Sequence, residues 1–125
     1  MALTNAGRDL IAAALFGDAF TAYDAANAHI GVGDGTGAFN ASHADLQGTN
    51  KLRKAMEAAY PTRAVNVLAF RSLFLTTEAN FAWNEWGVFN AASAGEMLNR
   101  KVESLGTKTS AQSWQLTVQL TVEAA

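Results

Sequence analysis

The sequence predicts a mostly-β domain, an antiparallel β-sandwich or flattened barrel with an N-terminal α-helix. Three observations support this fold class. Residues 113–123 alternate apolar and polar side chains with a period of two, as a half-buried strand does. Residues 65–75 and 81–103 are rich in β-branched and aromatic side chains, which strands favour. Residues 4–16 instead carry an apolar stripe with helical spacing.

The overall composition indicates a single folded domain whose low-charge surface is either weakly solvated or covered by something else, and we favour the second. Its 125 residues fit one domain, spanning residues 1–125. Only 16% of the residues are charged, against a typical quarter, while 50% are hydrophobic. There is no cysteine, which excludes disulfides and thiolate metal sites. Since no apolar run reaches the ~18 residues that span a bilayer, and no secretory pattern opens the chain, we expect synthesis in a cytoplasm and no membrane contact.

The first predicted element is a helix capped by Thr4 or Asn5 and ended by Gly17. Its apolar stripe consists of Leu10, Ile11, Ala14 and Leu15.

Residues 28–37 begin as a short strand and continue into a glycine-rich turn. The spacing G-V-G-D-G-T-G matches neither the dinucleotide fingerprint nor the lysine-containing P-loop, and Asp34 lacks the spaced carboxylates of an EF-hand. We therefore interpret the glycines as residues that adopt positive φ in a tight connection.

The remaining segments predict strands, with one ambiguity. Residues 51–60 have helical propensity but also fit an edge strand protected by lysines. Residues 65–75 fit a central strand covered on both faces, and residues 81–90 and 97–103 fit a hairpin. In the final strand, one face should point into the core with all of its apolar side chains buried: Trp114, Leu116, Val118, Leu120 and Val122.

Trp83 and Trp86 are candidate interface residues in the aromatic strand. They could form a stacking platform, but aromatics in a strand more often serve as core or interface anchors. An offset of three predicts that they lie on opposite faces of the sheet or at its end, with one tryptophan in the core and the other near a partner subunit.

No catalytic, cofactor or metal site is predicted. Glu78 and Glu85 could in principle act as a glycosidase pair, but no other feature indicates a substrate cleft. His29 and His43 lack the spacing of a helical metal site. We therefore expect a protein that is not an enzyme.

The charge distribution favours contacts between copies. Residues 1–50 carry five acids and one base (−4), while residues 51–125 carry eight bases and six acids (+2). Two unlike poles suit head-to-tail contacts in a homo-oligomer, for which we favour a trimer. The bases lack interleaved aromatics, so nucleic acid is not expected. The side chains expected to form cross-subunit pairs are the bases Lys51, Arg53, Lys54, Arg100 and Lys101, with the acids Asp18, Asp24, Asp34 and Asp45.

Three segments resemble those of a known group of proteins. The longest reads F-A-W-N-E-W-G-V-F-N-A-A-S-A-G-E-M-L-N-R-K-V, followed by E-S-L-G-T-K-T. Together with L-T-N-A-G-R-D-L-I-A-A-A and I-G-V-G-D-G-T-G, it resembles small virion structural proteins of tailed bacteriophages. A fainter likeness, through E-W-G-V-F-N-A and G-D-G, links the chain to phage tail-collar proteins, although the chain is short and has no fibre-like extension.

The resemblance implies a structural role in the virion. The first expectation is a capsid decoration or cement protein that binds the major capsid protein of the shell in many copies. The alternative is a tail or collar/fibre-attachment protein that binds other tail proteins.

Overall fold

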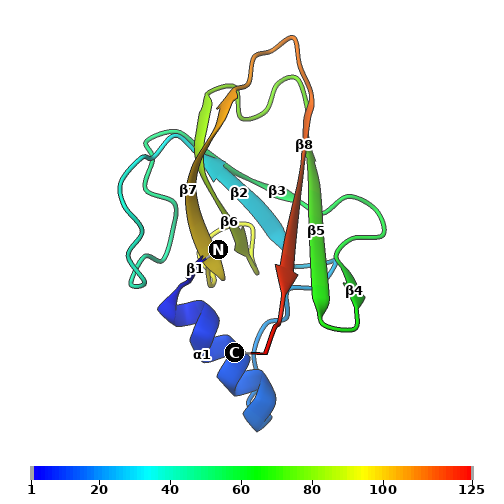
Figure 1. Cartoon of the computed structure of the whole chain (residues 1–125). Coiled ribbons are helices and arrows are strands. Elements are labelled where there is room, and N and C mark those ends of the chain that lie inside the picture. Colours follow the sequence, from blue (N-terminus) through cyan, green and yellow to red (C-terminus); the bar gives the residue numbers. More distant parts are fainter. Residues whose placement is uncertain (1, 125) are drawn as a thin grey trace.

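The protein, described over residues 2–124 by a computed structural model, forms two antiparallel sheets that face each other and one N-terminal helix (Figure 1). The five-stranded sheet has the order β1-β7-β6-β2-β3, and the three-stranded sheet has the order β4-β5-β8. The two sheets remain separate, so the sandwich form of the predicted fold is confirmed and the barrel is not. The elements are β1 (Ala2–Leu3), α1 (Asn5–Phe16), β2 (His29–Gly33), β3 (Lys51–Ala55), β4 (Thr62–Ala64), β5 (Val67–Phe74), β6 (Ala82–Phe89), β7 (Asn99–Thr107) and β8 (Trp114–Thr121).

Helix α1 begins and ends where its capping residues predicted. The hydroxyl of Thr4 accepts a hydrogen bond from the Gly7 N–H at 2.9 Å and donates to the carbonyl of Met97. Gly17 adopts the left-handed conformation, with φ 92°, and its N–H reaches the Ala13 carbonyl at 2.9 Å. The buried Thr4 therefore anchors the helix to the loop that joins β6 and β7.

The hydrophobic core lies between the two sheets. Side chains from β2, β5, β6 and β8 meet there, and Leu98 joins them from the segment just before β7. The buried core members are Ala28, Ile30, Val32, Phe70, Phe74, Ala79, Trp83, Trp86, Val88, Leu98 and Val118. A smaller cluster of Leu46, Phe89 and Met97 lies apart from this core.

The prediction for the final strand is correct in its alternation and wrong at its last residue. β8 pairs with β5 in the register Phe70↔Val118, and Val118 is buried between the sheets. Trp114, Leu116 and Leu120 pack against the core but are only partly buried. Val122 lies beyond the end of β8 and is 65% exposed, because no described residue covers this end of the strand.

The prediction that Trp83 and Trp86 lie on opposite faces is wrong. Both are buried in the same core. The pairing of β6 with β7 shifts register between Trp83 and Glu85, and such an irregularity breaks the strict alternation of side chains. Trp83 packs edge-to-face against Phe74 and Trp114, with ring centroids 4.8 and 5.0 Å away. Neither tryptophan is available to a partner.

Residues 51–60, whose sequence fits both a helix and an edge strand, begin with the strand β3. β3 pairs with β2 and forms one edge of the larger sheet, and its lysines and arginine give that edge charge. The predicted central strand is β5, which lies between β4 and β8. β6 and β7 form the predicted hairpin, closed by a bridge between Phe89 and Met97.

Candidate interaction surfaces

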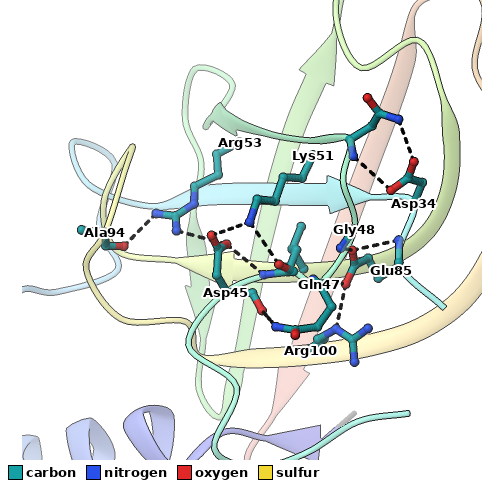
Figure 2. A network of polar contacts seen from close by, with 12 residues as sticks. Asp34, Asp45, Gln47, Gly48, Lys51, Arg53, Glu85, Ala94 and Arg100 are labelled. Carbon is teal, nitrogen blue, oxygen red and sulfur yellow. Dashed lines mark hydrogen bonds and ion pairs between the residues drawn. The ribbon is translucent and has the colours of Figure 1, made fainter. Parts of the chain in front are cut away.

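A buried ion pair on the outer side of the larger sheet holds the long loop 34–50 in place (Figure 2). Glu85 on β6 and Arg100 on β7 lie 2.7 Å apart, and neither side chain is exposed. The other contacts to the Glu85 carboxylate come from backbone N–H groups of Gly35 at 3.0 Å, Gln47 at 2.8 Å and Gly48 at 2.7 Å. One carboxylate therefore ties both ends of the loop to the sheet.

We name Glu85, Arg100 and the three N–H groups that bind the carboxylate the clamp. The glycines of this region make room for the clamp, which corrects the role predicted for them. A Cβ at Gly33 or Gly35 would lie 2.5 Å from the Glu85 carboxylate, and a Cβ at Gly31 would lie 2.6 Å from the Phe89 ring. None of them has positive φ; the glycines that do are Gly17, Gly95 and Gly106. The alternating glycines of β2 thus clear one face of the sheet so that Glu85 and Phe89 can lie across it.

The clamp holds the Glu85 carboxylate in its charged form. Burial disfavours the charged form of Glu85, but hydrogen bonds from the Gln47 N–H, the Arg100 guanidinium and the N–H groups of Gly48 and Gly35 outweigh it. The pKa of Glu85 therefore lies below its ordinary value. A carboxylate held ionised by four donors in a closed site is a poor proton donor at neutral pH.

The burial of Arg100 overturns the expectation that it is free to pair with another subunit. Its Nε donates to Glu85, while its two terminal nitrogens are buried without a hydrogen-bond partner among residues 2–124. Its charge could be read from the sequence. Its position facing Glu85 depends on the register of β6 and β7, in which Glu85 pairs with Val102.

The bases of β3 pair with acids of the same chain (Figure 2). Arg53 bonds the carbonyls of Ala91 and Ala94 at 3.0 and 2.8 Å, and its guanidinium lies 3.6 Å from the centre of the Phe89 ring. Asp45 accepts from both Arg53 and Lys51.

The other candidate bases also have partners in this chain. Lys54 pairs with Glu78 at 2.8 Å, and Lys101 lies 3.9 Å from Glu103. Of the five bases expected at an interface, the two most exposed are Lys51 and Lys101.

The other residues weighed as chemical sites are not brought together. Glu78 pairs with Lys54, whereas Glu85 pairs with Arg100, so the two carboxylates serve separate ion pairs. Among the described residues no group of three or more histidines, aspartates and glutamates could hold a metal ion. Over residues 2–124, no helix has the length and apolarity needed to span a bilayer.

Helix α1 lies near the end of the sandwich toward which β8 runs (Figure 1). An apolar groove of about 300 Å³ lies between the helix and this end of the sandwich. None of the described residues that line the groove carries a charged side chain. Its lining residues are Leu3, Leu10, Ile11, Ala14, Phe20, Tyr23, Leu68, Phe70, Leu98, Leu120, Thr121 and Val122. Tyr23 is fixed by donating its hydroxyl to the Glu96 carbonyl at 2.9 Å, and burial, with a contribution from the Glu96 charge, raises its pKa.

The groove runs along the part of α1 that follows its first turn, where the helix has no fully buried residue. Gly7 is the one buried residue of the helix, and a Cβ there would overlap the Leu98 carbonyl. Beyond that turn the helix projects away, leaving Leu15 and Phe16 at its end 87% and 85% exposed. We name these two residues the helix ridge.

The sequence contained part of the signal for this surface. The spacing of Leu10, Ile11, Ala14 and Leu15 predicts the apolar side of the helix, which could pack against a sheet or against a neighbouring molecule. Leu10, Ile11 and Ala14 line the groove, whereas Leu15 belongs to the ridge. Periodicity shows which side of a helix is apolar, but does not show whether the same chain covers it.

Comparison with protein-family models and with curated proteins found no match to this chain. The functional assignment therefore depends on the surfaces described above and on the resemblance of the three sequence segments.

Proposed function

We propose that this protein is a structural component of a tailed-bacteriophage virion, a capsid decoration or cement protein that binds the shell in many copies. The segments that resemble such proteins correspond to α1, β2 and the β6–β7 hairpin. These elements contain the Glu85–Arg100 ion pair and much of the core, so the resemblance extends through parts that determine the fold.

The observation that supports the proposal most is the apolar groove with the helix ridge beside it. Fully burying one large apolar side chain is worth roughly 1.5–3 kcal/mol. Burying Leu15 and Phe16 against a partner would therefore contribute about 3–6 kcal/mol before the entropy of association is subtracted. A partner with an apolar contact surface, such as the major capsid protein or a neighbouring copy, fits a surface with no charge.

The ridge and the groove also suit a head-to-tail arrangement of copies. A ridge on one copy that enters the groove of the next makes a heterologous contact, and such contacts form closed rings when the rotation between copies closes. We expect the ring to be a trimer. Asp45 already pairs with Lys51 and Arg53 within one copy, so ion pairs between copies would add little. Apolar burial is therefore the force that holds the ring together.

The test is binding of the purified protein to phage shells that lack it. We expect Leu15→Ser/Phe16→Ser to reduce binding at least tenfold. The control Val65→Ser removes another large apolar side chain, which is 86% exposed in the turn between β4 and β5, and should bind as the unmodified protein does. Equal binding by the ridge variant would contradict the proposed surface.

The alternative, a tail or collar component, is supported by the E-W-G-V-F-N-A segment of β6. Quantitative mass spectrometry of purified virions separates the two roles, because a shell decorator should be far more abundant than a collar component. Low copy number, with binding to tails and not to shells, would favour the alternative.

A further inference from the structure

β8 is an edge strand with a row of unpaired backbone groups. The N–H of Val122 donates to the Asn66 carbonyl at 2.9 Å, which is the side of β5. Because backbone groups alternate in direction along a strand, the even-numbered residues of β8 bond to β5. The odd-numbered residues, Gln115, Thr117, Gln119 and Thr121, point their N–H and C=O groups away from β5, where no strand of residues 2–124 pairs with them.

The other sheet edges carry features that discourage pairing, and β8 does not. β3 places Lys51, Arg53 and Lys54 along its edge, and β7 carries Lys101 and Glu103 beyond the short β1. Charge of this kind is the usual protection of an edge strand.

β4 and β8, the two edges of the smaller sheet, also differ in how well they are protected against pairing with another strand. β4 has only three residues, follows Pro61 and contains Arg63. β8 is eight residues long and has neither proline nor charge from Trp114 to Val122. It is therefore the edge best suited to accept another strand.

The inward side chains of β8 are also incompletely covered. Trp114, Leu116 and Leu120 are only partly buried, and Val122 is largely exposed. In an antiparallel pair, opposite side chains on one face lie about 4.5–5.5 Å apart. A strand added along this edge would cover these four apolar residues.

We propose that two copies of this chain pair their β8 strands antiparallel, about a two-fold axis at Val118. In this register Gln115 lies opposite Thr121 of the second copy, and Thr117 lies opposite Gln119. All four outward-facing residues of each strand then exchange N–H···O=C bonds, four donated by each copy and about eight in all.

The same register matches the inward side chains. Val118 meets Val118 of the second copy, Leu116 meets Leu120, and Trp114 meets Val122. The apolar residues of one copy thus face apolar residues of the other.

A second copy fits this edge because the strand is complementary to itself. The outer face brings only threonine and glutamine together, so two identical strands meet without charge repulsion. Pairing two β3 strands would instead place lysines and arginines against one another. The pair joins two three-stranded sheets into a continuous six-stranded sheet.

The first test uses a matched pair of variants that differ only at position 119. Thr117→Glu/Gln119→Glu places like charges opposite each other across the two-fold axis, whereas Thr117→Glu/Gln119→Lys places unlike charges there. Both positions are exposed, so both variants should fold. All samples, including the parent, carry Leu15→Ser/Phe16→Ser, so that association through the helix ridge does not contribute.

Sedimentation equilibrium should show a reversible dimer for the parent chain. We expect its dissociation constant to rise at least tenfold in the like-charge variant and to stay within about threefold in the unlike-charge variant. A monomeric parent, or equal association of all three proteins, would overturn the proposal, as would equal weakening of both variants. Shell binding is measured separately, so failure of the proposed function leaves this result interpretable.

The second test fixes the register. The chain has no cysteine, so single cysteines report specific neighbours. A mixture of Thr117→Cys and Gln119→Cys proteins should form disulfide-linked dimers under mild oxidation, because paired Cα atoms about 5.5 Å apart match disulfide geometry. A mixture of Thr117→Cys and Gln115→Cys proteins serves as the control and should cross-link at least tenfold less. Equal cross-linking in both mixtures would exclude this register.

Discussion

Replacing Glu85 by glutamine tests whether the buried clamp stabilises the fold. Glu85→Gln keeps the size of the side chain but removes its charge, while four donors still point at it. Arg100 is then left buried without an anion. Breaking a buried ion pair by removing one partner costs about 3–5 kcal/mol. Total stabilities of about 5–15 kcal/mol are typical of such domains, so this loss is a large share.

The loss can be measured by thermal and urea denaturation at pH 7. An unfolding entropy of about 2.1 cal/mol/K per residue gives roughly 260 cal/mol/K for this length, so we expect Tm to fall by about 10–20 °C. Glu123→Gln is the control, because Glu123 is exposed near the end of the chain, and it should change stability by less than about 0.5 kcal/mol. A Glu85→Gln variant within 1 kcal/mol of the parent would refute the reasoning.

A double variant identifies the source of the cost. Glu85→Gln/Arg100→Met removes both charges, so no unpaired charge remains in the interior. We expect the double variant to be more stable than Glu85→Gln alone. Additive losses would show that the two side chains act independently.

The pH dependence follows from the lowered pKa of Glu85. Its folded-state pKa lies below the unfolded value of about 4.3, so its stabilisation is complete above that value and is lost as the pH falls through the folded pKa. The unmodified protein should therefore lose urea resistance in acid more steeply than Glu85→Gln. The difference between the two proteins should shrink below about pH 4.

Three other substitutions test separate parts of the structure. Gly48→Ala should lower the free energy of unfolding by about 1–3 kcal/mol in urea denaturation, because a Cβ would lie 2.6 Å from the Gly35 N atom; Gly37→Ala, with no atom within 4 Å, should be neutral. Val118→Asp should abolish soluble expression, judged by the soluble fraction after lysis, since a charge at this position has no partner in the core. Trp86→Phe keeps an aromatic ring but loses the 3.1 Å hydrogen bond to Glu103, and should lower stability by about 1 kcal/mol; an unchanged urea midpoint would show that this bond contributes nothing.

The features that could be predicted from the sequence depend on local periodicity and capping. Thr4 and Gly17 limit α1 through their own backbone and hydroxyl chemistry, and the alternation around Val118 predicts β8 without knowledge of its partner strand. These signals involve residues a few positions apart. They were sufficient for the fold class and for most strand positions.

The clamp could not be predicted because its parts meet through tertiary pairing. Gly33 and Gly35 are close to Glu85 only once β2 and β6 are paired, so their role was mistaken for a turn preference. The register shift in β6 likewise brings Trp83 and Trp86 onto one core, against the simple rule of alternation. The charge of Arg100 also led to a wrong prediction, namely that this side chain is free to pair with another subunit. It is buried instead, because the Glu85 carboxylate lies opposite it.

The clamp also has a consequence for synthesis on the ribosome. The Gly48 N–H donates to Glu85, which lies 37 residues further along the chain. Arg100, the other partner of Glu85, lies 15 residues beyond Glu85. At about 5–20 residues per second, the loop is made roughly 2–7 s before Glu85 and a further ~0.75–3 s before Arg100. During that interval loop 34–50 has no docking site in its own chain. The β6–β7 hairpin, which is translated after this loop, therefore controls when loop 34–50 can adopt its final shape.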